Sequence, residues 1–142
     1  MNITTITYNT PEYKQMINLR YKILREPLGL TFSDEYLEKD RNDILCACFE
    51  KNIMIGCCIL TKVNSSTLQL RQMAVDNIHQ KAGIGCKLLA FVQLLTKENG
   101  FSCIILHARA TAVRFYEKNG YVKQGEEFTE VGISHFKMIK HL

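Results

Sequence analysis

Residues 75–89 place a glycine-rich loop between a strand-like segment and a helix-like segment. Gly83 and Gly85 fall where the helix is expected to begin, and glycine lets the backbone approach a ligand closely. The first N–H groups of a helix lack partners within it and carry partial positive charge, so they favour a phosphate. Lys81 and Lys87 could add charge. The spacing is neither that of a Walker A loop nor that of a Rossmann fingerprint, and the glycines could instead serve a tight turn and close packing.

The six cysteines and four histidines form no recognisable metal-ligand pattern. No cysteine pair has C-x2-C spacing, and the histidines do not complete a zinc-finger arrangement. Cys46 and Cys48 point to one face of a strand-like run, whereas the adjacent Cys57 and Cys58 point to opposite faces of the next. Because free cysteine often packs as a small hydrophobe, we expect reduced, structural cysteines and no metal site.

The first half of the chain is expected to supply a strand, a helix and an antiparallel meander. Alternating β-branched residues at 3–8 indicate a strand, and Thr10 caps a helix that runs from Pro11 to about Arg25. Short polar turns then separate three apolar runs. The meander strands are 43–49, 53–62 and 67–75.

The second half is expected to continue with a helix from about 83 to 99, a strand at 101–107 and a short helix at 110–118. Closing strands are expected at 121–124 and about 132–140. Because a helix joins strands 67–75 and 101–107, these two are expected to be parallel, linked by a right-handed crossover. The fold class is therefore α/β (α+β), with a mixed, mostly antiparallel central sheet of about seven strands and flanking helices in a single domain, residues 1–142.

Two motifs in this layout resemble those of one enzyme superfamily. The segment 73–85, MAVDNIHQKAGIG, resembles motif A of the GNAT superfamily of acyl-CoA N-acyltransferases in its Gln-x-x-Gly-x-Gly core. The segment 112–121, AVRFYEKNGY, is similar to that superfamily's A-x-x-F-Y-E-K-x-G-F signature. The tail, 125–138, resembles a bacterial branch of uncharacterised and ElaA-like members. The resemblance covers nearly the whole chain, and the expected element order is that of the GNAT fold.

The resemblance implies that strands 67–75 and 101–107 splay apart and that acetyl-CoA or CoA binds as cosubstrate between them. The pantetheine arm would bond to strand main chain and the pyrophosphate to loop N–H groups, with Phe115 packing beneath. The cofactor-binding residues implied in this way are Met73, Ala74, Val75, Gln80, Lys81, Ala82, Gly83, Ile84, Gly85, Cys86 and Phe115.

The resemblance also implies the chemistry, in which a neutral primary amine attacks the acetyl carbonyl directly in a ternary complex. Tyr116 matches the tyrosine whose hydroxyl reaches the thioester sulfur, which makes it the candidate general acid; without the resemblance it would be interpreted as a packed aromatic residue. A strand N–H is expected to stabilise the oxyanion. Direct transfer needs no cysteine nucleophile, and neither Cys86 nor Cys103 has a histidine partner evident in the sequence.

Two positions depart from the superfamily pattern. Arg109 stands where an asparagine is common, and its guanidinium could clamp a phosphate or a substrate carboxylate or lie on the surface. The strand leading into Ala74 offers no carboxylate as a general base. Candidates elsewhere for a base or a substrate contact are His107, Glu126, Glu127 and His135, with Asp34 and Glu35 less favoured. Either histidine could instead have a structural role.

Composition restricts the alternatives. The 142 residues carry a net charge of +4, are 46% hydrophobic and 23% charged, and have a pI near 8.7. The charge is mild and scattered, so nucleic-acid binding is not expected. No apolar run reaches the length of a membrane span, and the first ten residues lack signal-peptide features, which favours a cytoplasmic protein.

The sequence therefore predicts an N-acetyltransferase that uses acetyl-CoA, with a small-molecule or protein amine as acceptor and no membrane or nucleic-acid partner. An edge-strand homodimer fits this architecture. A non-catalytic acyl-CoA-binding sensor is the alternative, which the missing base would favour.

Overall fold

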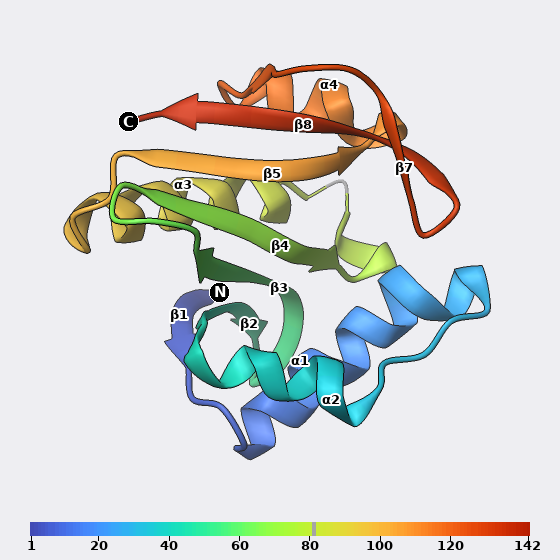
Figure 1. Cartoon of the computed structure of the whole chain (residues 1–142). Helices are drawn as coiled ribbons and strands as arrows, with labels where there is room; N and C mark the ends of the chain where they lie inside the picture. Colours follow the sequence, from blue (N-terminus) through green and yellow to red (C-terminus); the bar gives the residue numbers. More distant parts are fainter. Residues whose placement is uncertain (81) are drawn as a thin grey trace.

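One mixed sheet of eight strands organises the chain (Figure 1), whose computed structural model describes residues 1–80 and 82–142. The strand order is β1-β2-β3-β4-β5-β8-β6, and β7 pairs with β8. Every neighbouring pair is antiparallel except β4 and β5, which are parallel. The strands are β1 (Asn2–Ile6), β2 (Ile44–Glu50), β3 (Ile53–Lys62), β4 (Thr67–Val75), β5 (Cys103–Arg109), β6 (Val122–Lys123), β7 (Phe128–Glu130) and β8 (Ile133–His141).

Four α-helices and several short helical turns flank this sheet. The α-helices are α1 (Pro11–Arg20), α2 (Asp34–Glu38), α3 (Ile84–Glu98) and α4 (Val113–Lys118). A π-helical segment, η1 (Tyr21–Arg25), and the short η2 (Glu26–Leu28) continue α1 toward α2. The other short turns are η3 (Lys39–Asn42), η4 (Asn77–His79) and η5 (Ala110–Ala112). None of the helices in the described residues is long and apolar enough to cross a membrane.

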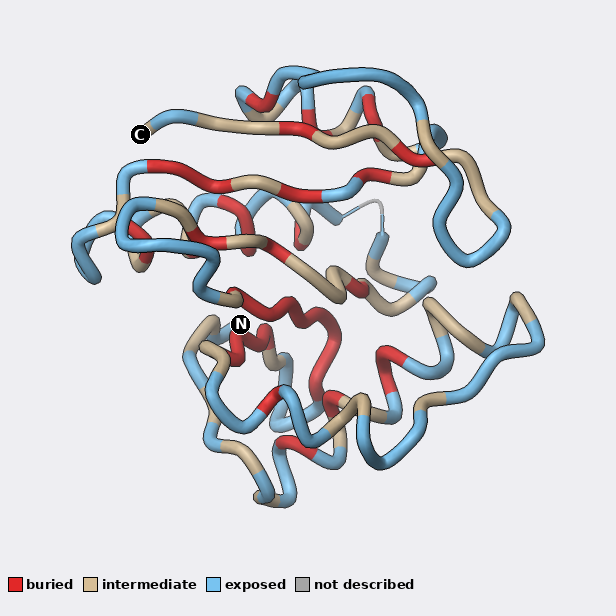
Figure 2. Tube along the Cα trace, in the orientation of Figure 1, coloured by how far each residue is buried: buried red, intermediate tan, exposed pale blue. Residues whose placement is uncertain are grey.

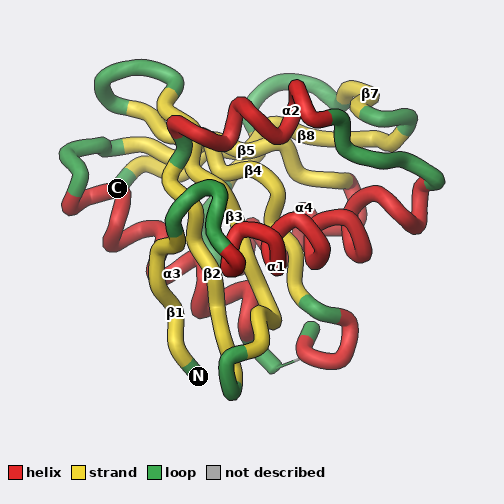
Figure 3. The backbone as a smooth tube through the Cα atoms, turned by 90° about the horizontal axis from the view of Figure 1, so that it is seen from below, coloured by secondary structure: helices red, strands yellow, loops and turns green. Residues whose placement is uncertain are grey.

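The two faces of the sheet build separate cores, because alternate strand residues point to opposite sides. The α1 helix packs on one face with Ala47 and Cys57, whereas α3 and α4 cover the other face with Cys46 and Cys58. Figure 2 shows buried residues concentrated along the central strands, and Figure 3 shows α2 and α3 on opposite sides of them. The prediction that Cys57 and Cys58 point to opposite faces is confirmed.

The parallel strands β4 and β5 pair only over their first residues. Their register runs from Thr67 opposite Cys103 to Leu70 opposite Leu106, after which the strands separate. A register shift between β3 and β4 lies in the same region, and Gln72 has a φ of 55°, a conformation that L-residues rarely adopt. This β-bulge turns β4 away from β5, so the predicted splayed pair is confirmed.

The fold agrees with the predicted class. The predicted and observed elements differ at their ends and in one short strand that was not predicted. The predicted strand 101–107 begins two residues later, because Phe101 N–H instead bonds to the Thr96 carbonyl (3.1 Å) beyond Gly100, whose φ is 83°. That bond closes the C-terminal turn of α3. The sequence prediction missed β7, a three-residue strand formed by a hairpin whose turn residues Val131 and Gly132 both have positive φ.

Candidate active site

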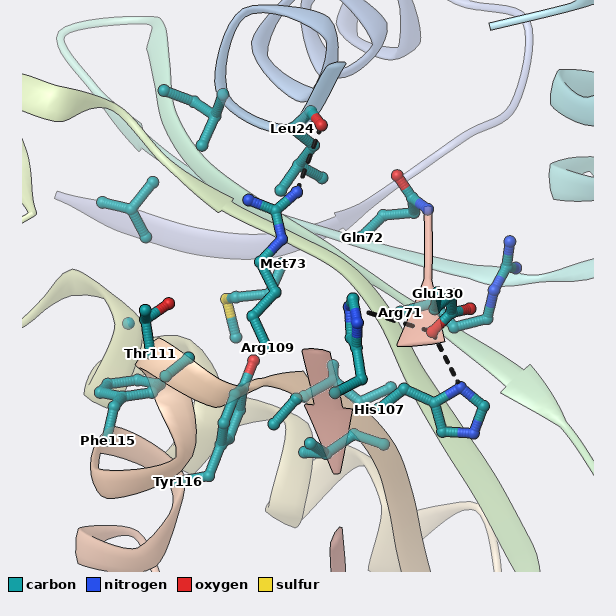
Figure 4. A pocket seen from close by; sticks show the side chains of 18 of the residues that line it. Leu24, Arg71, Gln72, Met73, His107, Arg109, Thr111, Phe115, Tyr116 and Glu130 are labelled. Atoms are coloured by element: carbon teal, nitrogen blue, oxygen red, sulfur yellow. Dashed lines mark hydrogen bonds and ion pairs between the residues drawn. The ribbon is translucent and has the colours of Figure 1, made fainter. Parts of the chain in front are cut away.

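A cavity of about 800 Å³ opens where β4 and β5 separate. Its walls come from β4, β5, the start of α3, η5 and α4, the β7–β8 hairpin and the turn after α1. Figure 4 shows Thr111 and Phe115 at one end, with His107 and Glu130 at the other. We call these the loop end and the hairpin end.

The loop end is formed largely by backbone at the start of α3. Gly83, with a φ of 78°, is the N-cap and supplies no capping side chain, so the first N–H groups of α3 are left for an anion. Gly85 is in contact with Phe115, since a Cβ at this position would lie 2.8 Å from the ring. Gln80 donates to the Val75 carbonyl (3.0 Å) and so ties the loop to the end of β4.

The structure brings most of the predicted cofactor residues to this end. Gly83, Gly85, Gln80, Cys86 and Phe115 line the cavity, as do Met73 and Val75 of β4. Ala74 is buried in the α1 core and Ile84 in the α3 core, so their side chains do not line it. Ala82 is an exposed turn residue, and Lys81 lies outside the described residues.

The edge of β4 supplies a second backbone surface. Residues 71–75 continue to pair with β3 on one side, but β5 has already diverged on the other. Their main-chain groups on the open side therefore lack a strand partner and face the cavity, where Met73 and Val75 lie. Such unpaired peptide groups seek hydrogen-bond partners, which an amide-containing ligand could provide.

Tyr116 on α4 lies between the two ends. Its side chain is 8% exposed, packs edge-on against Tyr121 (ring centroids 5.8 Å apart) and lines the cavity. Burial raises its pKa well above the usual value for tyrosine, so the hydroxyl keeps its proton. In Figure 4 this hydroxyl points toward the middle of the cavity.

Two histidines and a glutamate meet at the hairpin end. His107 Nδ1 lies 3.3 Å from Glu130 Oε2, and His135 Nε2 lies 4.0 Å from the same oxygen. The Nδ1 of His135 is 2.8 Å from the Ile133 carbonyl, which can only accept, so that nitrogen carries a proton. Phe128, stacked with His135 and edge-on to His107, holds the group together.

The other predicted polar candidates occupy different places. Glu126 and Glu127 lie in the exposed link between β6 and β7 and do not line the cavity. Arg109 does line it and is not a surface residue, but it spans the gap between the diverging strands and donates to the Leu24 carbonyl of η1 (3.2 Å). Asp34 and Glu35 lie in the first turn of α2 and do not line the cavity.

An arginine-rich wall faces the hairpin end. Arg71 of β4 donates to the Tyr36 hydroxyl (2.8 Å) and to Thr61 Oγ1 (3.1 Å). Gln72 Nε2 donates to the same hydroxyl (2.8 Å). Arg25 lies 5.6 Å from the Tyr36 ring centroid. Arg25, Tyr36, Arg71 and Gln72 line the cavity, whereas Thr61 does not.

Sequence reasoning missed Glu130, Arg25 and Tyr36 as site residues. Each comes from a segment far from the two motifs, and only the folded sheet brings them together. Val131-Gly132 is not a typical hairpin dipeptide, because valine rarely adopts the positive φ of 46° that it has here, so no local signal predicted the hairpin that carries Glu130.

Among residues 1–80 and 82–142, no group of three or more His, Cys, Asp or Glu side chains is placed so that it could hold a metal ion. All six cysteines are free, and Cys46, Cys48, Cys57, Cys58 and Cys103 are buried. Cys86 is exposed, with Asn119 Nδ2 3.6 Å from its sulfur.

A parallel pair that splays beside a helix whose N-cap is a glycine is the arrangement expected of the GNAT fold. The sequence model described as an acetyltransferase (GNAT) domain matches residues 28–142, and the chain belongs to this family. It is therefore a GNAT acetyltransferase.

Similar proteins support this family assignment. The chain is 36% identical to the uncharacterised N-acetyltransferase YjcF of Bacillus subtilis strain 168 over 138 residues, 95% of this chain and 96% of that one. A GNAT family acetyltransferase from Elizabethkingia anophelis with acetyl-CoA bound superposes with a TM-score of 0.77, at 21% identity over 99% of this chain and 97% of that one. Escherichia coli ElaA gives a TM-score of 0.83 at 14% identity, over 98% of each chain.

The residues present fit acetyl-CoA. The uncapped start of α3 suits a pyrophosphate, and Gly83 has no neighbouring heavy atom within 4 Å of where its Cβ would lie. The open edge of β4 suits the amides of the pantetheine arm. Both features are backbone groups, so they bind without charged side chains.

Proposed function

We propose that this protein moves an acetyl group from acetyl-CoA to a primary amine by direct attack in a ternary complex. The observation that carries the proposal is a single cavity that joins three parts: an anion site, a protonated phenol and a histidine–carboxylate pair. The nitrogen–carbon bond forms as the carbon–sulfur bond breaks, the amine loses a proton, and CoA leaves as a thiolate.

His107 is the proposed general base. His107 Nδ1 lies 3.3 Å from the Glu130 carboxylate, which favours the neutral tautomer with its proton on Nδ1 and its lone pair on Nε2. That lone pair takes the proton of the attacking amine. His135 is the second candidate, because its Nδ1 proton is held by the Ile133 carbonyl and its Nε2 is therefore the basic atom.

Tyr116 is proposed to stabilise the departing sulfur. An ordinary thiol, with a pKa near 8.5, is a stronger acid than a tyrosine whose pKa is raised by burial. The phenol therefore serves best by donating a hydrogen bond to the thiolate, which keeps its charge until solvent protonates it. A charge-assisted bond of this kind is stronger than a neutral one.

Calorimetric titration with CoA and acetyl-CoA, followed by a thiol-release assay with a broad panel of amines, tests the proposal. We expect binding of both ligands and amine-dependent release of CoA thiol. No binding at millimolar ligand would contradict the site. Binding without thiol release for any amine would favour a non-catalytic acyl-CoA sensor.

A further inference from the structure

The side chains that line the cavity carry a strong excess of positive charge. Among the described lining residues, four have a guanidinium or ammonium group and one, Glu130, has a carboxylate. The cations are Arg25, Arg71, Arg109 and Lys118. Lys118 lies on the cofactor side, on α4, whereas the arginines come from β4, β5 and η1.

The charge of these arginines is only weakly neutralised by the protein. Arg71 reaches Asp43 at 3.5 Å, which is the edge of hydrogen-bond distance. Within residues 1–80 and 82–142, neither Arg25 nor Arg109 has a carboxylate within ion-pair distance. The Nε of Arg25 is buried and has no hydrogen-bond partner.

Aromatic rings hold the guanidinium groups in place instead of carboxylates. Phe32 stacks with Tyr36 (centroids 5.8 Å apart), and Arg25 lies 4.8 Å from the Phe32 centroid. Arg20 lies at the same distance from that ring, but Asp40 pairs with it at 2.8 Å. Arg71 lies 5.7 Å from the Tyr36 centroid. Arg71 already donates to Thr61 and Tyr36, whereas stacking holds Arg25 without using its donors, which can bind a planar anion.

We propose that the amine acceptor also carries an anionic group, a carboxylate or a phosphate, which Arg25 and Arg71 bind. This inference rests on the proposed function, because it names the class of substrate for the same cavity. The anion would lie against the wall formed by Arg25, Tyr36 and Arg71, with the amine directed toward His107. A polycationic acceptor would meet the positive charge of Arg25, which has no carboxylate partner among the described residues, and this disfavours its binding.

Matched acceptors with one changed group provide the test. Initial rates of thiol release are measured for amino acids and for their carboxamides, which keep the amine and the shape but lose the negative charge. Aminoalkyl phosphates form a second anionic arm, and a polyamine and an aminoglycoside form the cationic arm. We expect kcat/KM for at least one class of anionic acceptor to exceed that of its neutral counterpart by about tenfold or more. The class with the higher kcat/KM shows whether the anion is a carboxylate or a phosphate.

Two variants test whether the arginines of this wall cause the preference for anionic acceptors. Arg25→Gln and Arg71→Gln should raise KM for the anionic acceptor by about tenfold while KM for the neutral counterpart changes less than twofold. Arg114→Gln, which removes an exposed arginine of α4 outside the cavity, should change neither. Equal kcat/KM for charged and neutral acceptors, or a preference for the cationic arm, would overturn the inference.

Titration with CoA distinguishes failure of the inference about the anionic acceptor from failure of the proposed acetyltransferase function. If CoA does not bind, the acetyltransferase site itself is contradicted. If CoA binds and no acceptor reacts, binding of the same acceptors to the CoA complex is measured by calorimetry. Absence of binding for every anionic member at 10 mM overturns the inference, and selective binding of anionic members that Arg25→Gln abolishes supports it.

Discussion

The two ends of the cavity are lined by different kinds of chemical group. At the loop end the proposed recognition groups are backbone N–H and carbonyl groups of α3 and β4, shaped by Gly83 and Gly85. At the hairpin end they are side chains, with His107 and Glu130 brought together from β5 and β7. Acetyl-CoA presents the same diphosphate and amides to every enzyme that binds it, so a backbone site suffices. An acceptor differs from enzyme to enzyme, and side chains can change while the fold is kept.

This division predicts that substitutions at the two ends affect different kinetic quantities. The hairpin end should control turnover and acceptor KM, and the loop end should control the affinity for acetyl-CoA. Each variant below is therefore measured for both.

The largest effect is expected for His107→Asn. Removal of a general base lowers turnover by about 10²- to 10⁴-fold, so kcat should fall by at least about 100-fold while the Kd for CoA stays within twofold. Steady-state thiol release and calorimetric titration measure the two quantities.

His141→Asn and His135→Asn are the controls for that variant. His141 is exposed at the end of β8 and does not line the cavity, so its replacement should leave kcat unchanged. If His135→Asn lowers kcat by 100-fold and His107→Asn does not, His135 is the base. If neither variant lowers kcat, the acceptor amine reacts without a protein base and the hairpin end binds substrate only.

A smaller effect is expected for Tyr116→Phe, because one hydrogen bond to the leaving sulfur is lost. Turnover should fall by about 10- to 100-fold, and the affinity for CoA should change much less. Tyr121→Phe is a matched control, since that tyrosine is also buried and also has its pKa raised by burial but does not line the cavity. Equal losses for both variants would indicate a packing effect and remove the assignment of Tyr116 to the sulfur.

The same division explains what the sequence could predict. The loop end was predictable because a glycine-rich loop and the helix that follows it are local, and Gly83, Gly85 and Phe115 fall within two short motifs. The three-strand meander and the parallel pair followed from hydrophobic patterning and a single crossover. The hairpin end was not predictable, because Glu130 meets His107 only through the pairing of both β5 and β7 with β8.

Short elements were a second source of error. The three-residue strand β7 has too few residues for an alternation pattern, so the acidic candidates were placed at Glu126 and Glu127 instead of Glu130. The role of Arg109 also depended on tertiary structure, because its partner is a carbonyl 85 residues earlier in the chain. Neither contact has a local sequence signal.

At the loop end, Gly85→Ala should weaken CoA binding by about tenfold. The added methyl group would lie 2.8 Å from the Phe115 ring, which must then move toward the cofactor side of the cavity. The KM for the acceptor amine should change less than twofold. The double variant Gly85→Ala with Phe115→Leu, which makes room for the methyl group, should recover part of the affinity. Unchanged Kd in the single variant would show that the contact between Gly85 and Phe115 does not shape the cofactor site.

The smallest effect concerns stability at alkaline pH and compares the same two buried tyrosines. Burial raises the pKa of both Tyr116 and Tyr121 above the value of about 10 expected in the unfolded chain. Their contribution to the free energy of unfolding is therefore complete below pH 10 and is lost as the pH rises toward the folded-state pKa, because the unfolded chain releases protons that the folded chain retains.

Thermal unfolding between pH 8 and pH 11 measures this loss. Between pH 8 and pH 11, the Tm of each phenylalanine variant should fall by a few degrees less than the Tm of the parent protein. A difference of about 1 kcal/mol in the free energy of unfolding produces a shift of this size in a domain of this length. Lysine titration occurs in the same range but is common to all three proteins, so the difference isolates the phenol. Tyr121→Phe should alter this decline alone, whereas Tyr116→Phe should alter both the decline and turnover. A decline identical to that of the parent in both variants would mean that the phenols are solvated in the folded protein, and the cavity wall at Tyr116 would then be open to water.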